Sequence, residues 1–186
     1  MEIYVIRHTK VDVPPGHCYG QTDVNLLNDY PDEIALFKDR IPTDLDTVIS
    51  SPLKRCTFIA DDFSPYYSTD DRLMEMNFGQ WEMNKLDDIP KEQLQNWMDD
   101  IAHCCPPYGE NLLKVQDRVT SFLNELRHLN YTKVLLVTHA GPIRCIWNYI
   151  LQTPLSSTFK IPVDFGEVLH FNLGNTPKDD YIIKKV

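Results

Sequence analysis

The sequence predicts an α/β fold, a single-domain three-layer α/β/α sandwich with a mostly parallel central sheet. Short apolar runs rich in β-branched residues alternate with segments in which apolar residues recur every three or four positions. The run 134–137 is apolar throughout, which is typical of a central parallel strand covered on both faces. Strands that alternate with helices pack as one sheet between two helical layers. Because the chain of 186 residues has no internal repeat and no linker, we expect residues 1–186 to form a single domain.

Each element follows from a local pattern. Strands are predicted at 3–6, 47–50, 134–137, 168–173 and 181–186, and helices at 32–40, 51–63, 93–101, 112–129 and 141–151. The helix at 112–129 has the clearest pattern, with apolar residues at 112, 115, 119, 122, 126 and 129. Ser51 and Pro52 predict the start of the second helix, with serine as its cap and proline at its first position.

Charge and cysteine content exclude several classes of protein. Asp and Glu outnumber Lys and Arg by 27 to 18, and the resulting net charge of −9 disfavours binding to nucleic acid or to an anionic membrane. No stretch approaches the roughly 20 apolar residues of a transmembrane helix, and the first residues are too briefly apolar for a signal peptide. The cysteines show no C-x-x-C pairing, which favours reduced thiols. We therefore expect a cytoplasmic protein with no nucleic-acid or membrane partner.

His103 stands beside Cys104 and Cys105, three residue types that can bind a metal ion. Adjacent side chains rarely converge on one ion, however, and the sequence shows no second cluster of ligands. We therefore expect no metal site there.

Two histidines directly follow predicted strands. His8 comes after the first strand, and His139 comes after the fully apolar strand. Because open α/β sheets bind ligands beyond the carboxyl ends of their strands, the two imidazoles are expected to share one crevice. Arg7, Arg55 and Arg144 would bring guanidinium groups, which bind phosphate oxygens bidentately, to the same edge. In a chain of net charge −9, this positive cluster predicts a phosphorylated small molecule as the ligand.

Four segments occur in order along the chain: Ile6-Arg7-His8-Thr9, then Ser50-Ser51-Pro52-Leu53-Lys54-Arg55, then residues 73–82 with Glu75, and Thr138-His139-Ala140-Gly141-Pro142-Ile143-Arg144. They resemble the motifs of the histidine phosphatase superfamily, often called the phosphoglycerate mutase-like superfamily. The resemblance spans residues 3 to 147, and agreement of four ordered motifs by chance is improbable.

The resemblance implies a role for each motif residue. His8 would attack the phosphoryl group and form a phosphohistidine that water later hydrolyses. Arg7, Arg55 and His139 would hold the phosphoryl oxygens and neutralise the charge that grows in the transition state. Glu75 would protonate the leaving alkoxide and then activate the water. The arginines supply the positive charge, so the resemblance implies no metal and no other cofactor.

This chemistry sets two expectations for His8. Its attacking ring nitrogen must be unprotonated, so the other ring nitrogen should donate to a backbone carbonyl. Its ring should also face His139 across the pocket and be open to solvent.

A narrower resemblance lies in Pro15-Gly16-His17-Cys18-Tyr19-Gly20-Gln21-Thr22-Asp23. This segment is similar to the corresponding part of α-ribazole phosphatases of cobalamin assembly, which remove the 5′-phosphate from α-ribazole phosphate. By that resemblance Tyr19, Gly20 and Gln21 would contact the phosphate, together with Ala140 after the second histidine.

Four positions depart from the superfamily's common residues. Thr9 replaces a glycine, as is usual in the α-ribazole phosphatase subgroup, and Met83 also stands in place of a glycine. Tyr108-Gly109-Glu110-Asn111 replaces Gly-Gly-Glu-Ser, with Tyr108 for glycine and Asn111 for serine. Met83 and Asn111 are expected on the substrate side of the pocket, so they bear on the substrate rather than on the chemistry. A broad-specificity sugar or glycerate phosphatase, a phosphoglycerate mutase-like enzyme and a non-catalytic binder of phosphorylated ligands therefore stay open as alternatives.

Two other phosphatase classes fit less well. Asp44-Leu45-Asp46-Thr47-Val48 matches the Asp-x-Asp-x-Val pattern of haloacid-dehalogenase-like phosphatases, which use an aspartate nucleophile and magnesium. That chemistry needs the aspartates at the carboxyl end of a strand, whereas here the predicted strand follows them. Cysteine-dependent phosphatases need Cys-x5-Arg, and no cysteine of this chain is followed by arginine at that distance.

Overall fold

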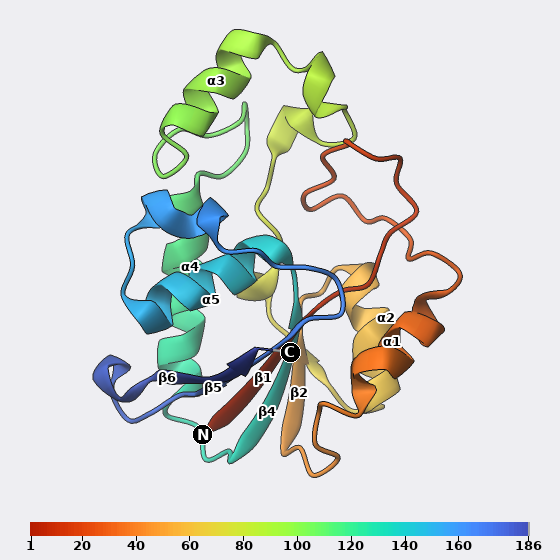
Figure 1. Ribbon diagram of the computed structural model, residues 1–186, viewed down its shortest axis with the longest axis vertical. Helices are drawn as coiled ribbons and strands as arrows, with labels where there is room; N and C mark the ends of the chain where they lie inside the picture. The colour runs from red at the N-terminus through yellow and green to blue at the C-terminus, as the bar shows by residue number, and fades with distance from the viewer. Residues whose placement is uncertain (186) are drawn as a thin grey trace.

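A six-stranded sheet lies at the centre of the computed structural model, which describes residues 1–185 (Figure 1). The strands are β1 (Glu2–Arg7), β2 (Thr47–Ser50), β3 (Ser68–Thr69), β4 (Lys133–Thr138), β5 (Val168–Asn172) and β6 (Tyr181–Lys185), in the spatial order β3-β2-β4-β1-β5-β6. β1 and β2 pair in parallel with β4, and β3 pairs in parallel with β2, whereas β5 runs antiparallel to both of its neighbours. The predicted, mostly parallel sheet is therefore confirmed.

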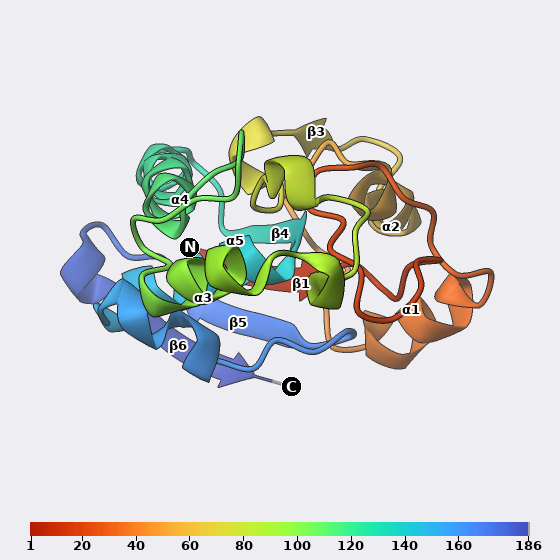
Figure 2. The same ribbon diagram turned by 90° about the horizontal axis from the view of Figure 1, so that it is seen from above.

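Helices cover both faces of this sheet. α1 (Tyr30–Lys38) and α2 (Lys54–Phe63) lie on one face, and α4 (Leu112–Leu126) and α5 (Ala140–Leu151) lie on the other (Figure 1 and Figure 2). α3 (Lys91–Asp99) stands apart from both layers, at the top of Figure 1. Single turns of 3-10 helix occur at η1 (Asp71–Leu73), η2 (Gly79–Trp81), η3 (Leu86–Asp88) and η5 (Pro177–Asp179), and a longer one at η4 (Leu155–Lys160). No helix in the described part of the chain is long and apolar enough to cross a membrane.

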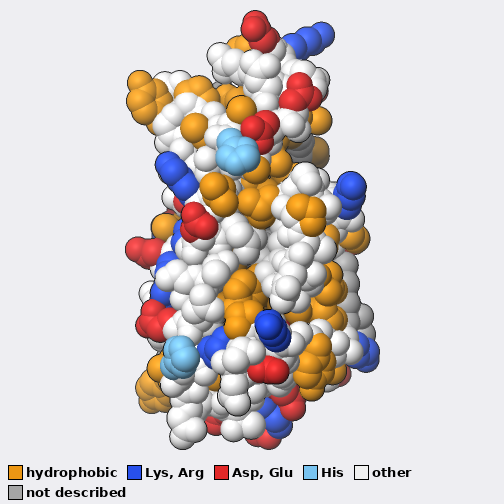
Figure 3. All heavy atoms as spheres, turned by 90° about the vertical axis from the view of Figure 1, so that its left-hand side faces the viewer, with side chains coloured by type: hydrophobic (Ala, Val, Ile, Leu, Met, Phe, Trp, Pro, Cys, Tyr) orange, Lys and Arg blue, Asp and Glu red, His pale blue; other side chains and the backbone are white. Residues whose placement is uncertain are grey.

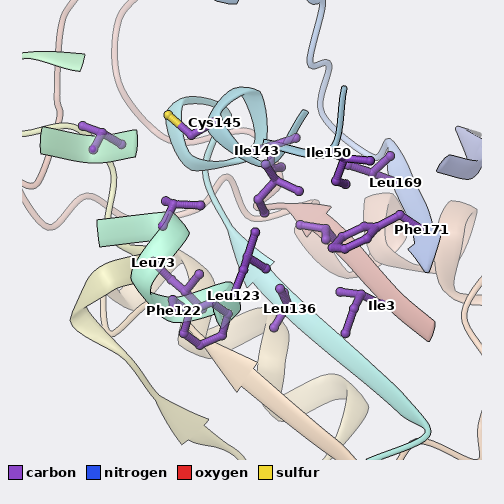
Figure 4. Close-up of a cluster of buried hydrophobic side chains, with 14 of the residues drawn as sticks. Ile3, Leu73, Phe122, Leu123, Leu136, Ile143, Cys145, Ile150, Leu169 and Phe171 are labelled. Atoms are coloured by element: carbon purple, nitrogen blue, oxygen red, sulfur yellow. The ribbon is translucent and has the colours of Figure 1, made fainter. Parts of the chain in front are cut away.

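The central strands supply side chains to two separate cores. On β1, Ile3 and Val5 belong to the core beneath α4 and α5, whereas Tyr4 and Ile6 belong to the core beneath α1 and α2. Figure 4 shows the first core, where buried side chains of the sheet and of both helices meet, among them Ile3, Leu123, Leu136, Ile143 and Phe171. Burial on both faces explains why the run 134–137 contains only apolar residues.

Several predicted element boundaries were wrong by a few residues. α2 begins at Lys54, and Leu53 occupies the N-cap position without a side-chain hydrogen bond. The predicted cap, Ser51, instead places its hydroxyl 2.8 Å from His139 Nε2. α1 and α3 each begin two residues earlier than predicted, and α4 ends at Leu126 rather than at residue 129. β3 was not predicted, because its two residues are exposed and carry no apolar pattern. Val186, at the end of the last predicted strand, lies outside the described residues.

Candidate active site

The parallel register of β1 and β4 brings the two strand-end histidines together. Arg7 pairs with Thr138 across the two strands, so His8 and His139 are the next residue on each side. His8 N donates to Thr138 O at 3.0 Å, which continues the pairing by one residue. The two imidazole ring centres are 5.1 Å apart, as the predicted crevice requires.

The hydrogen bond of His8 fixes the position of its proton. Nδ1 lies 2.7 Å from Thr9 O, and because a carbonyl oxygen can only accept, Nδ1 must carry the proton. Nε2 is then left with its lone pair. Burial, reinforced by the positive charges of Arg55 and Arg7, lowers the pKa of His8 well below its ordinary value of 6.5. The ring is therefore neutral at physiological pH, with Nε2 as a nucleophilic atom.

His139 has the opposite tautomer. Its Nδ1 lies 3.2 Å from Arg55 Nε, which can only donate, so Nδ1 accepts and Nε2 donates to Ser51 Oγ. The thiol of Cys56 also lies 3.5 Å from Nε2. Burial, followed by the charge of Arg55, lowers the pKa of His139 well below its ordinary value. His139 is thus a neutral ring locked between α2 and the segment before it.

Two guanidinium groups flank the histidines. Arg55 is fully buried, and its Nη1 and Nη2 donate to the carbonyls of Thr22, at 2.9 Å, and of Gly20. Arg7 Nη1 donates to Val163 O at 2.8 Å, and its guanidinium carbon lies 3.8 Å from the ring centre of Phe165. The structure thus brings Arg7 and Arg55, two of the three predicted arginines, together with both predicted histidines.

The side chain of Glu75, which follows η1 in the chain, lies against the first turn of α5. Its Oε1 accepts from the backbone N–H of Met76 at 2.9 Å and of Gly141 at 3.1 Å. These contacts place the carboxyl group next to Ala140, the first residue of α5. A negative side chain is favoured at a helix N-terminus, where backbone N–H groups are unpaired.

The predicted phosphate loop lies against the same groups. The ring of Tyr19 has its centre 6.3 Å from that of His8, and the Arg55 guanidinium lies 5.1 Å from the Tyr19 ring centre. Burial raises the pKa of Tyr19, so its hydroxyl stays protonated. Gly20 has a φ of 41°, which favours glycine, and Gln21 Nε2 donates to Glu75 O at 2.8 Å. Tyr19, Gly20 and Gln21 therefore lie in one cluster with His8, Arg55 and Glu75.

His8 is far less accessible than expected. Only 1% of its surface is exposed, so the expectation of an open ring was wrong. The rings of Tyr19, His139 and Phe165 surround it, with the Phe165 ring centre 5.7 Å away. Phe165 lies in a segment without periodicity or a motif, so nothing in the sequence indicated that it would cover His8.

A large apolar cavity lies beside Glu75. Its volume is about 570 Å³, and it is lined by His17, Cys18, Tyr19, Gly20, Glu75, Phe78, Leu86, Leu94, Trp97, Met98, Ile101 and Phe159. Met98 and Phe159 are 62% and 57% exposed, so the wall of the cavity is also open to solvent. Figure 3 shows exposed hydrophobic side chains gathered near the top of the molecule, at the end where α3 lies. No lysine or arginine is present among these lining residues.

Two carboxylates and one arginine that the sequence analysis left without a role support the site. Glu110 Oε2 accepts from Asn77 N at 2.9 Å and pairs with Arg118 of α4. Arg118 Nη2 in turn donates to Glu75 O at 3.1 Å. Glu82 accepts from the N–H groups of Gln21 and Thr22. Glu82 and Glu110 lie in the segments 73–82 and 108–111, which the sequence analysis compared with the superfamily. Their place in those segments was the only feature of the sequence that could have indicated a supporting role.

Met83 and Asn111, two of the residues that depart from the superfamily's common ones, lie outside the cavity lining, and each has a local structural role. Met83 has a φ of 62°, in the left-handed region that favours the glycine it replaces. Asn111 caps α4, because its side-chain oxygen accepts from Lys114 N at 3.0 Å. Neither side chain lines the cavity, contrary to expectation.

Within residues 1–185, no group of three or more His, Cys, Asp or Glu side chains is arranged to hold a metal ion, so His103, Cys104 and Cys105 form no such cluster. Asp44 and Asp46 precede β2, at the end of the sheet opposite His8. Asp46 accepts from Lys133 N at 2.9 Å, and Asp44 forms an ion pair with the Lys133 side chain at 2.6 Å. This placement does not fit a haloacid-dehalogenase-like site.

Comparisons with known proteins agree with the fold and the motifs. The family model of the histidine phosphatase superfamily (branch 1) matches residues 3–177. Phosphoserine phosphatase 1 of Hydrogenobacter thermophilus is 26% identical over 88% of this chain and 82% of its own. The adenosylcobalamin/alpha-ribazole phosphatase of Escherichia coli is 32% identical over 50% of this chain and 48% of its own. The crystal structure of the alpha-ribazole phosphatase from Shigella flexneri has the same fold, with a TM-score of 0.82 and 24% identity over 92% of this chain and 90% of that one.

Proposed function

Because the chain belongs to the histidine phosphatase superfamily and is a phosphoric monoester hydrolase, we propose that it acts without a metal, through a phosphohistidine on His8. The observation that carries this proposal is the hydrogen bond from His8 Nδ1 to Thr9 O at 2.7 Å. It leaves the lone pair of Nε2 free, in a ring that burial, reinforced by the charges of Arg55 and Arg7, keeps neutral.

In the first step, the Nε2 lone pair attacks phosphorus, and the bond between phosphorus and the ester oxygen breaks. Glu75, in its protonated form, gives its proton to the departing alkoxide. Arg7 and Arg55 neutralise the charge on the phosphoryl oxygens. Arg7 Nε has no hydrogen-bond partner among the described residues, so it is available to donate to a phosphoryl oxygen while Nη1 stays on Val163 O.

In the second step, water attacks the phosphohistidine. Glu75, now ionised, takes a proton from the water as the new P–O bond forms and the N–P bond breaks. Inorganic phosphate leaves, and the lone pair returns to His8 Nε2. The one proton that Glu75 gives to the alkoxide in the first step is thus replaced by a proton from water in the second.

We propose α-ribazole 5′-phosphate as the substrate, which would place the enzyme in the cytoplasmic assembly of cobalamin. The leaving group of this ester carries a flat, apolar base, and the apolar cavity beside Glu75 is suited to such a group. The lack of a lysine or arginine among its lining residues disfavours a leaving group with a carboxylate. The resemblance of segment 15–23 to α-ribazole phosphatases supports the same choice.

A second candidate substrate is phosphoserine or a phosphorylated glycerate or sugar. Arg144 favours the carboxylated esters: its guanidinium lies 5.4 Å from the ring centre of Phe159, at the edge of the cavity. Only its Nε has a carbonyl partner, Ile161 O at 2.9 Å, so its Nη groups could pair with a substrate carboxylate. The relative named phosphoserine phosphatase 1 also matches most of this chain.

A rate comparison tests both parts of the proposal. We expect kcat/KM to be highest for α-ribazole 5′-phosphate among a set that includes phosphoserine, 3-phosphoglycerate and a sugar phosphate, with no loss on addition of EDTA. A preference for phosphoserine or 3-phosphoglycerate would overturn the proposed substrate and leave the mechanism in place. Full activity of a His8→Ala variant would overturn the mechanism.

A further inference from the structure

Glu82, which directly follows η2, is the most heavily hydrogen-bonded carboxylate near the site. Its Oε1 accepts from Gln21 N at 2.9 Å and from Phe78 N at 3.0 Å. Its Oε2 accepts from Thr22 N at 2.8 Å and from the Thr22 hydroxyl. One side chain therefore holds the segment 20–22 against the segment that follows Glu75.

The other side of the segment 20–22 holds groups of the site. The carbonyls of Gly20 and Thr22 accept from the two Nη atoms of Arg55, and the Gln21 side chain donates to Glu75 O. Gly20 itself leaves no space for a side chain, because a Cβ there would collide with Glu82. The three residues thus form a rigid bridge between Glu82 on one side and Arg55 and Glu75 on the other.

The bridge continues to His139. Arg55 Nε donates to His139 Nδ1, and this contact decides which nitrogen of His139 carries the proton. Arg55 is fully buried, so its orientation depends on the carbonyls that accept from it. Glu82 does not line the cavity beside Glu75 and does not contact His8 or His139.

We propose that Glu82 is a positioning residue: by fixing the segment 20–22, it fixes the Arg55 guanidinium and, through it, the tautomer of His139. The inference rests on the proposed function only for its effect on turnover, because the positioning itself is a property of the unliganded protein. A carboxylate suits the role because it only accepts hydrogen bonds, and four donors point at Glu82. A glutamine would turn one NH2 group toward those donors.

The test compares Glu82→Gln with a matched control, Glu125→Gln. Glu125 lies on α4, and its replacement removes the carboxylate of an exposed ion pair with Arg72 of η1. We expect Glu82→Gln to lower kcat for p-nitrophenyl phosphate by up to about 100-fold, as misplacement of supporting groups does. We also expect weaker binding of inorganic phosphate and, in spectra of 15N-histidine protein, loss of the single neutral tautomer of His139. Glu125→Gln should match the wild type in all three measurements.

A Glu82→Gln protein that keeps the His139 spectrum and the phosphate affinity of the wild type would overturn the inference, whatever its thermal stability. If Glu82→Gln does not fold, Thr22→Val decides, since it removes only the hydroxyl donor: we expect smaller changes in the same direction, and an unchanged spectrum overturns the inference. The spectrum needs no turnover, so an inactive wild-type protein would refute the proposed function without deciding this inference.

Discussion

The ring proton of His8 and that of His139 are each fixed by a neighbouring group that can act only as an acceptor or only as a donor. Thr9 O can only accept, so His8 carries its proton on Nδ1, and Arg55 Nε can only donate, so His139 carries its proton on Nε2. The nucleophilic nitrogen of His8 is thus ready before a substrate arrives. No relay to a carboxylate is needed to activate it.

The same burial makes the stability of the protein depend on pH. The pKa values of His8 and His139 are lowered in the folded state, so below about pH 6.5 the unfolded chain binds more protons than the folded one. The free energy of unfolding should therefore decrease as the pH falls below that value. In urea unfolding at about pH 7.5 and about pH 5.5, we expect this decrease to be smaller in His139→Asn than in the wild type. His128→Asn, a change at an exposed histidine, should behave as the wild type does. Equal decreases in the wild type and His139→Asn would contradict the explanation.

The contribution of Glu75 to the rate of hydrolysis is expected to increase with the basicity of the leaving group. An alkoxide needs a proton to leave, whereas an activated aryl oxide does not, and general acid catalysis contributes about 10²–10⁴-fold. We therefore expect Glu75→Gln to slow hydrolysis of alkyl phosphates far more than that of p-nitrophenyl phosphate. An equal loss on both esters would show that Glu75 does not protonate the departing oxygen.

At the scale of elements, the segment 161–167 between η4 and β5 covers the nucleophile. Phe165 packs against the His8 ring, and Arg7 holds the segment through Val163 O and the Phe165 ring. Because Phe165 covers a His8 ring that is almost fully buried, substrate binding is expected to be coupled to a displacement of this segment.

Removal of the Phe165 ring should expose His8. We expect Phe165→Ala to make carbethoxylation of His8 by diethyl pyrocarbonate several-fold faster, measured by mass spectrometry of the peptide that contains residue 8. Phe58→Ala, which removes a half-exposed ring from α2, should leave that rate unchanged. An unchanged rate in Phe165→Ala would mean that the ring does not limit access to His8.

Helices and strands with a clear hydrophobic pattern were predictable from the sequence, whereas the side-chain contacts between segments distant in sequence were not. Two apolar runs predicted β1 and β4 as strands, and the shared crevice required these strands to be neighbours. Their observed parallel pairing places His8 beside His139. The start of α2 was misread because Ser51-Pro52 has the composition of a helix start, whereas the Ser51 hydroxyl is used by His139. Phe165 and Glu82 act through contacts between segments distant in sequence, and no local pattern encodes such contacts.

At the scale of the whole molecule, the charge distribution matches an anionic substrate. The chain has a net charge of −9, yet two arginines and two histidines meet at the carboxyl ends of β1 and β4. The surrounding protein keeps those histidines neutral, so the guanidinium groups provide the positive charge of the site. The sequence predicted this convergence but not the closed state of the pocket, which depends on the tertiary packing of Tyr19 and Phe165.

Trapping of the covalent intermediate examines the central claim most directly. The protein is mixed with a 32P-labelled phosphomonoester, quenched with alkali within one turnover, and digested for peptide mapping. Our account expects the label on the peptide with His8, stable to alkali and released by acid, and absent from His8→Ala. Label on any other residue, or rapid turnover with no labelled peptide, would contradict it.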